Sequence, residues 1–237
     1  MLGIFSKTTD SNFIEAAGYS GLDFIILDQE HGPATLETIN NHVRASKVSG
    51  IKTFVRVATN CPSLIGAALD TGADGVQIPN ISSYDEALAA VKAARFYPQG
   101  MRGVCRFVKA AEFGTKDKAA YFKEANTKTI ILQVEGKDGV EALDDILSIV
   151  EFDVLFIGPY DLSQSLGHPG EIDHPEVNKF IKQIADKVKM SEKKLATFSD
   201  NLESAIRLKN MGFEIIAYSV DINIYTEACK TLKSKVK

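Results

Sequence analysis

Short apolar segments alternate with amphipathic helical segments along the chain, and this alternation limits the possible fold more than any other feature. Most of the apolar segments are continuous in hydrophobicity and rich in Ile, Val and Phe, which is typical of strands covered on both faces by helices. We expect eight strands, at Leu2–Phe5, Asp23–Leu27, Thr53–Val57, Gly75–Ile78, Thr129–Val134, Val154–Ile157, Leu195–Phe198 and Ile215–Tyr218. Such a repeat over 237 residues predicts an α/β fold, a (β/α)₈ TIM barrel.

Helix start and stop signals lie between the expected strands. Thr35 and either Ser82 or Ser83 are candidate N-caps, Pro175 suits a first helical position, and Gly212 suits a helix end. A doubly wound open sheet is the structural alternative, but its usual GxGxxG turn after an early strand is missing from the sequence. The barrel is therefore the preferred prediction.

Domain organisation follows from the absence of a Pro-, Gly- or Ser-rich linker. We expect one domain over residues 1–237. One connection, at about residues 95–128, is too long for an ordinary barrel loop and carries no expected strand. Long excursions inside a compact domain are usually functional or form interfaces, although an ornamental insertion is the competing interpretation.

Composition excludes several classes of protein. The net charge is -4, and Lys and Arg are dispersed, so nucleic acid is not an expected partner. The three cysteines are scattered without a CxxC pair, which argues against a disulfide framework or a thiolate zinc site. No apolar run approaches the roughly 18 residues of a membrane span, and the first residues do not resemble a signal peptide. We expect a cytoplasmic protein without a membrane partner.

Polar side chains gather where the expected strands end, which is where barrel enzymes place their chemistry. The second strand runs into Asp28 and His31, and the third carries Arg56. Side chains alternate along a strand, so Gln133 and Glu135 share one face of the fifth. The sixth strand leads into "GPYDLS", which contains Asp161. If these faces point inward, two carboxylates, an amide, a guanidinium and an imidazole line one mouth.

Two carboxylates on adjacent strands suit a divalent cation that prefers oxygen ligands, such as Mg²⁺ or Mn²⁺. The carboxylate and keto oxygens of a 2-oxo acid can chelate such an ion. Arg56 would then stabilise an enolate oxygen, and His31 would carry a proton, because histidine titrates near neutral pH. Each residue also has a structural interpretation: Arg56 and Glu135 could form an ion pair, Asp161 could cap a turn, and His31 could bond to backbone.

Several motifs resemble the HpcH/HpaI aldolases, class II metal-dependent pyruvate aldolases of the phosphoenolpyruvate/pyruvate barrel superfamily. The resemblance covers nearly the whole chain, and its motifs are "DFIILDQEHGP", "FVRV", "GADGVQIPNISSYDEA", "FYPQGMRGV", "ILQVEG" and "VLFIGPYDLSQSLG". It implies reversible cleavage of a 4-hydroxy-2-oxo acid, of the 2-dehydro-3-deoxy sugar acid or 4-hydroxy-2-oxo-diacid type, to pyruvate and an aldehyde. It also implies a homohexamer in which the C-terminal helix is exchanged between subunits.

The resemblance assigns roles residue by residue. Glu135 and Asp161 look like ligands of Mg²⁺, Mn²⁺ or Co²⁺, and Gln133 resembles a glutamine near the metal and pyruvate. Arg56 is similar to the enolate-stabilising arginine, and His31 to the catalytic base. Asp70 matches an aspartate that reaches the histidine from a neighbouring subunit, and Asp28 is a nearer candidate for orienting His31. The backbone at Gly158, Pro159, Tyr160 and Asp161 resembles a loop that holds the pyruvate carboxylate.

Tyr160 departs from the resemblance, because a small residue or Asn is frequent at its position, and this puts substrate choice in doubt. A class I Schiff-base aldolase is the nearest alternative, with Lys7 as its only suitable lysine. A citrate-synthase-like or lyase enzyme of the same superfamily, or a catalytically inactive binding barrel, are the others. The sequence leaves the aldehyde open.

Overall fold

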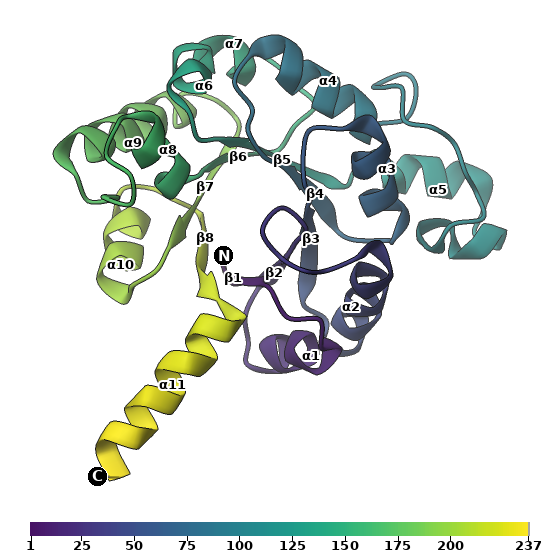
Figure 1. Cartoon of the computed structure of the whole chain (residues 1–237). Helices are drawn as coiled ribbons and strands as arrows, with labels where there is room; N and C mark the ends of the chain where they lie inside the picture. The colour runs from purple at the N-terminus through teal and green to yellow at the C-terminus, as the bar shows by residue number, and fades with distance from the viewer. Residues whose placement is uncertain (237) are drawn as a thin grey trace.

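Eight parallel strands form a closed barrel in the computed structural model, which describes residues 1–236, and the predicted TIM barrel is confirmed. Helices surround the barrel, and the C-terminal helix projects away from it (Figure 1). The strands are β1 Leu2–Ser6, β2 Phe24–Asp28, β3 Lys52–Arg56, β4 Gly75–Ile78, β5 Thr129–Val134, β6 Val154–Ile157, β7 Lys194–Ser199 and β8 Ile215–Val220. All eight predicted strands are therefore present, with ends that move by at most two residues.

The helices lie between the strands and are often capped where the sequence predicts. Thr35 and Ser83 accept backbone N–H groups at the starts of α2 and α4, and Pro175 opens α9. The helical segments are α1 Ser11–Tyr19, α2 Leu36–Ser49, α3 Pro62–Asp70, α4 Tyr84–Ala94, η1 Lys109–Gly114, α5 Lys118–Ala125, α6 Lys137–Glu141, α7 Leu143–Leu147, α8 Pro159–Ser165, α9 Pro175–Val188, α10 Leu202–Asn210 and α11 Asp221–Val236.

The barrel encloses its own small apolar core. Phe54 of β3 and Ile131 of β5 belong to this interior cluster, together with Phe5 and Phe156. A second, larger cluster fills the space between the strands and the outer helices. Because side chains alternate along a strand, residues two positions beyond the interior cluster also face inward, at the carboxyl end of the barrel. Strand alternation thus delivers the next polar residues of β3 and β5 to the mouth of the barrel.

Three aspartates close the opposite, amino end. Asp23, Asp74 and Asp153 each stand directly before an even-numbered strand and accept the N–H of a residue at the start of the preceding strand. The distances are 2.6 Å from Leu2 N to Asp23 Oδ2, 2.9 Å from Thr53 N to Asp74 Oδ2 and 2.8 Å from Ile130 N to Asp153 Oδ2. These bonds satisfy backbone donors that the sheet ladder leaves free.

Residues 95–128, between α4 and β5, contain η1 and α5 and extend from one side of the barrel (Figure 1). They form a small core of their own, in which Phe96, Ala111 and Tyr121 are buried. Lys237, the last residue of the expected domain, lies outside the described residues. Among residues 1–236, none of the helices combines the length and hydrophobicity needed to cross a membrane.

Candidate active site

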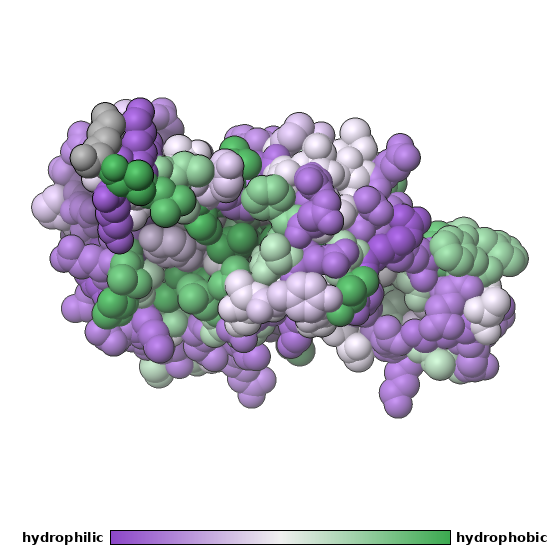
Figure 2. Space-filling model, turned by 90° about the horizontal axis from the view of Figure 1, so that it is seen from below, coloured by the Kyte–Doolittle hydropathy of each residue, from purple (hydrophilic) through white to green (hydrophobic). Residues whose placement is uncertain are grey.

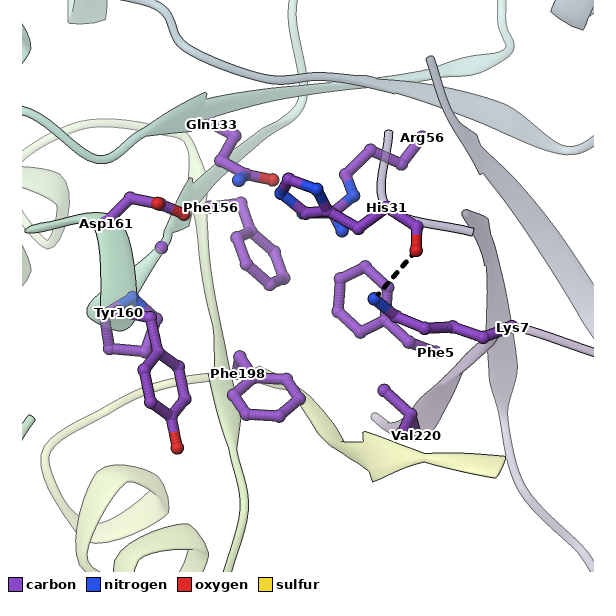
Figure 3. Close-up of a pocket in the computed structure, with 12 residues that line it drawn as sticks. Phe5, Lys7, His31, Arg56, Gln133, Phe156, Tyr160, Asp161, Phe198 and Val220 are labelled. Carbon is purple, nitrogen blue, oxygen red and sulfur yellow. Dashed lines mark hydrogen bonds between the residues drawn. The ribbon is translucent and has the colours of Figure 1, made fainter. Parts of the chain in front are cut away.

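A cavity of about 290 Å³ opens at the carboxyl ends of the strands. Its volume suits a small organic acid. Figure 3 shows His31, Arg56 and Gln133 along one edge, Asp161 and Tyr160 on a second side, and Lys7 and Val220 on the side opposite Asp161. The lining residues are Phe5, Lys7, His31, Arg56, Gln133, Phe156, Gly158, Pro159, Tyr160, Asp161, Phe198 and Val220. Most residues singled out from the sequence therefore meet around one cavity.

Arg56 is held by two acidic residues of the β2 end. Its Nε donates to Asp28 Oδ1 at 2.9 Å and its Nη2 to Asp28 Oδ2 at 2.8 Å, while Nη1 lies 3.0 Å from Glu30 Oε2. Burial alone would raise the pKa of Asp28, but the hydrogen bonds and charge of Arg56 outweigh burial and lower it. The structural interpretation in which Arg56 pairs with Glu135 is wrong for the described residues, since its ion-pair partners are Asp28 and Glu30.

Glu135 is buried directly behind the cavity wall. A Cβ on Gly158 would come within 2.3 Å of Glu135 Oε2, so only glycine allows this close approach. Gln133 Nε2 donates to Oε2 at 2.5 Å, and the backbone N–H of Asn80 donates to Oε1 at 2.8 Å. Burial, with smaller contributions from the charges of Asp161 and Glu30, raises the pKa of Glu135 to about 7.

The carboxylates here fit a divalent cation. Burial makes the charged form of Glu135 costly, and the nearby charges of Asp161 and Glu30 add to that cost. A bound cation would offset this cost. Asp161, from the start of α8, lines the same cavity. Both residues offer carboxylate oxygens, which Mg²⁺ and Mn²⁺ prefer.

His31 turns its ring toward the cavity in Figure 3, close to Gln133 and Arg56. Its side chain is 58% exposed, and Nε2 lies 4.0 Å from Glu30 Oε2. Asp28, the nearer candidate for orienting this histidine, accepts the backbone N–H of His31 at 3.3 Å rather than a ring nitrogen. Asp28 therefore positions the His31 loop and not the imidazole itself.

Asp70 lies at the end of α3 and is absent from the residues that line the cavity. Its Oδ1 accepts a hydrogen bond from Arg102 Nη2 at 2.5 Å, and Arg102 belongs to the segment between α4 and β5. Its expected role across a subunit boundary stays a prediction. Tyr160, which follows Pro159 at the start of α8, donates its hydroxyl to Asp200 at 2.5 Å. Burial and this hydrogen bond raise the pKa of Tyr160 to about 12.

Sequence reasoning gave no role to several residues of the site. Glu30 stands inside "DQEHGP" and contacts Arg56, and its pKa is raised, mainly by burial. Asn80 adopts a left-handed conformation, with φ of 57°, and also donates its side-chain amide to Glu30 at 3.1 Å. Gln77 donates to Gln133, which continues the amide chain to Glu135. The charge of Glu30 beside His31 could have marked it as a site residue from the sequence alone. The contacts of Asn80 depend on a left-handed turn, which the sequence does not indicate.

A second group of ligand-type side chains lies away from the cavity. His168, Glu171 and His174, between α8 and α9, place one ligand atom each within 4.8 Å of one another. His168 also bonds to Glu176 Oε2 at 3.0 Å, and His174 accepts the N–H of Glu176 at 3.3 Å. These bonds have a structural use, because they fasten the loop to the start of α9.

Comparisons with known proteins show that the chain is similar to enzymes of one family. Residues 1–228 match the family model described as HpcH/HpaI aldolase/citrate lyase. The 5-keto-4-deoxy-D-glucarate aldolase of Citrobacter koseri is 33% identical over 237 residues, which are 100% of this chain and 91% of the relative. The structure of an HpcH/HpaI aldolase/citrate lyase family protein from Burkholderia cenocepacia J2315 aligns with a TM-score of 0.95 and 30% identity, over 100% of this chain and 94% of that one. The structure of the citrate synthase SbnG aligns with a TM-score of 0.88 and 28% identity, over 99% of this chain and 92% of that one.

Proposed function

Because the chain belongs to the HpcH/HpaI aldolase/citrate lyase family, we propose that it cleaves a 4-hydroxy-2-oxo acid reversibly to pyruvate and an aldehyde, with the help of a divalent cation. The chain is a carbon–carbon lyase. The observation that carries the proposal is the meeting of His31, Arg56, Gln133 and Asp161 around one cavity, with Glu135 buried behind its wall.

Glu135 and Asp161 would hold the cation, which is Mg²⁺, Mn²⁺ or Co²⁺ in this proposal. When bound, it would polarise the keto group of the substrate and favour negative charge on that oxygen. Gln133 and the backbone N–H of Asn80 orient the Glu135 carboxylate. The backbone from Gly158 to Asp161 lines the cavity where the carboxylate of the pyruvate half would lie.

His31 would remove the proton from the C4 hydroxyl, directly or through a water. The O–H electrons form the carbonyl of the leaving aldehyde, the C3–C4 bond breaks, and its electron pair passes into the enolate of pyruvate. Arg56, fixed by Asp28 and Glu30, would stabilise the enolate oxygen until C3 takes up a proton. Two hydrogen bonds to Asp28 and an ion pair with Glu30 hold this guanidinium, so little reorganisation is needed during the reaction.

The predicted oligomer belongs to the same proposal. The exposed hydrophobic side chains of α11 are Ile222, Ile224, Tyr225, Leu232 and Val236. Figure 2 shows hydrophobic side chains gathered on the side of the molecule that carries this projecting helix. We propose that other subunits cover α11 in a homohexamer, in which Asp70 would approach the His31 of a neighbour. Light scattering on the intact protein gives the number of subunits.

A pyruvate-release assay over a panel of 4-hydroxy-2-oxo acids, with and without EDTA, tests the function. We expect release that EDTA abolishes and Mn²⁺ restores. Trapping of a pyruvate adduct on Lys7 by borohydride, with activity that resists EDTA, would instead indicate a class I aldolase. Condensation of an acetyl group with oxaloacetate, without aldol cleavage, would favour the citrate-synthase-like alternative that the SbnG likeness supports.

A further inference from the structure

Lys7 lies in the cavity but has no role in the chemistry described above. It follows β1, and its backbone N–H donates to Asp221 Oδ1 at 3.0 Å, which fixes the start of its side chain. The side chain is 24% exposed, and Nζ donates to the carbonyl oxygen of His31 at 3.3 Å. Nζ also lies 3.4 Å from Asp28 Oδ2. The ammonium group is thus held at the cavity wall.

Lys7 retains capacity for a ligand. An ammonium carries three hydrogens, and His31 O and Asp28 Oδ2 account for two. Arg56 directs one N–H each of Nε, Nη1 and Nη2 at Asp28 and Glu30, which leaves two N–H groups for the enolate oxygen.

The opposite side of the cavity carries negative charge. Asp161 and Tyr160 lie there, across the cavity from Lys7 (Figure 3), and Tyr160 donates to the carboxylate of Asp200. The wall between the two sides is apolar and includes Phe5, Phe156 and Phe198. A second carboxylate on a substrate would be repelled beside Asp200 and attracted beside Lys7.

We propose that Lys7 binds a carboxylate on the aldehyde half of the substrate, so that 4-hydroxy-2-oxo diacids are preferred over monoacids. The inference rests on the proposed function, because it places the pyruvate half near Glu135 and Asp161. C4 and its substituent then extend across the cavity toward Lys7. The aldehyde released would itself carry a carboxylate.

A matched pair of substrates tests the inference. In 4-hydroxy-2-oxoglutarate the terminal group is a carboxylate, and in 4-hydroxy-2-oxopentanoate it is a methyl group on the same skeleton. We expect the wild-type kcat/KM to favour the diacid, and Lys7→Gln to lower the ratio of the two kcat/KM values at least tenfold, mainly through the KM of the diacid. Lys7→Arg should keep most of the preference. Lys52→Gln, at the exposed start of β3, is the matched control and should not change the ratio.

Two results would overturn the inference. One is a wild-type enzyme without preference for the diacid. The other is an equal loss for both substrates in Lys7→Gln, which would show that Lys7 only holds Asp28 and the His31 loop. Exchange of pyruvate C3 protons in D₂O, measured on the wild type, tests the proposed function separately. If exchange is absent, calorimetry of the Mn²⁺-loaded protein with 2-oxoglutarate and 2-oxopentanoate still decides whether Lys7→Gln removes a carboxylate preference.

Discussion

Acidic residues occupy both ends of the barrel, but their surroundings differ. At the amino end, Asp23, Asp74 and Asp153 each accept a backbone N–H at the edge of the sheet, and the Asp153 side chain is 48% exposed. At the carboxyl end, Asp28 is fully buried and Glu135 is nearly so, beside a cavity. Carboxylates at the amino end stabilise the fold. Those at the carboxyl end carry a desolvation cost, which Arg56 offsets for Asp28 and the proposed cation would offset for Glu135.

Loss of a proposed metal ligand should have the largest effect. Glu135→Gln keeps the shape of the side chain but removes its charge, and we expect kcat to fall roughly 10³-fold, since a bound cation contributes several kcal/mol to such reactions. Steady-state cleavage at saturating Mn²⁺ measures this. Full activity in Glu135→Gln would show that the buried charge at the carboxyl end of the barrel is not needed for catalysis, and the distinction from the amino end would be lost.

Arg56→Ala should come next. Removing one donor to a developing oxyanion typically costs about 10²–10³ in rate. We expect that loss both in cleavage and in pyruvate proton exchange, while calorimetry still detects Mn²⁺ binding. Arg56→Lys separates charge from geometry, because lysine keeps a charge beside Asp28 but lacks the planar fork. An active Arg56→Ala enzyme would rule out the assigned role.

The raised pKa of Glu135 predicts a pH dependence of metal binding. A carboxyl group with a pKa of about 7 is increasingly protonated as the pH falls below 7, and the protonated form does not bind a cation. Affinity for Mn²⁺ should therefore fall by about fivefold between pH 7 and pH 6. The folded pKa lies above the unfolded value, so Glu135 also makes the metal-free protein less stable as the pH rises toward 7. Titration calorimetry at several pH values should show the change in affinity, and a flat profile would contradict it.

The smallest effect belongs to the amino end. Asp153→Ala removes the acceptor of the Ile130 N–H and a partner of Arg95, and we expect a loss of about 1 kcal/mol in the free energy of unfolding. Activity per folded molecule should not change. Urea denaturation followed by circular dichroism measures the free energy of unfolding, and active-site titration measures the activity per folded molecule. A large loss of kcat in Asp153→Ala would show that this end also takes part in catalysis.

The sequence predicted the scaffold well because most strands are continuous apolar runs with polar neighbours. Alternation at period two also predicted that Gln133 and Glu135 share one face of β5. Whether that face points inward was left open, and the closed barrel brings Arg56 and Gln133 to one cavity. It did not predict the partner of Arg56. Asp28 meets Arg56 because β2 and β3 pair them in register, and register depends on the closed sheet rather than on either strand alone. The contacts of Asn80 depend on a left-handed turn that no local pattern specified.

Anomalous diffraction from crystals soaked with Mn²⁺ and pyruvate tests the central claim most directly. We predict a manganese peak between the carboxylates of Glu135 and Asp161, with pyruvate in the cavity beside Arg56 and His31. A peak only at His168, Glu171 and His174, with none at the cavity, would contradict the account.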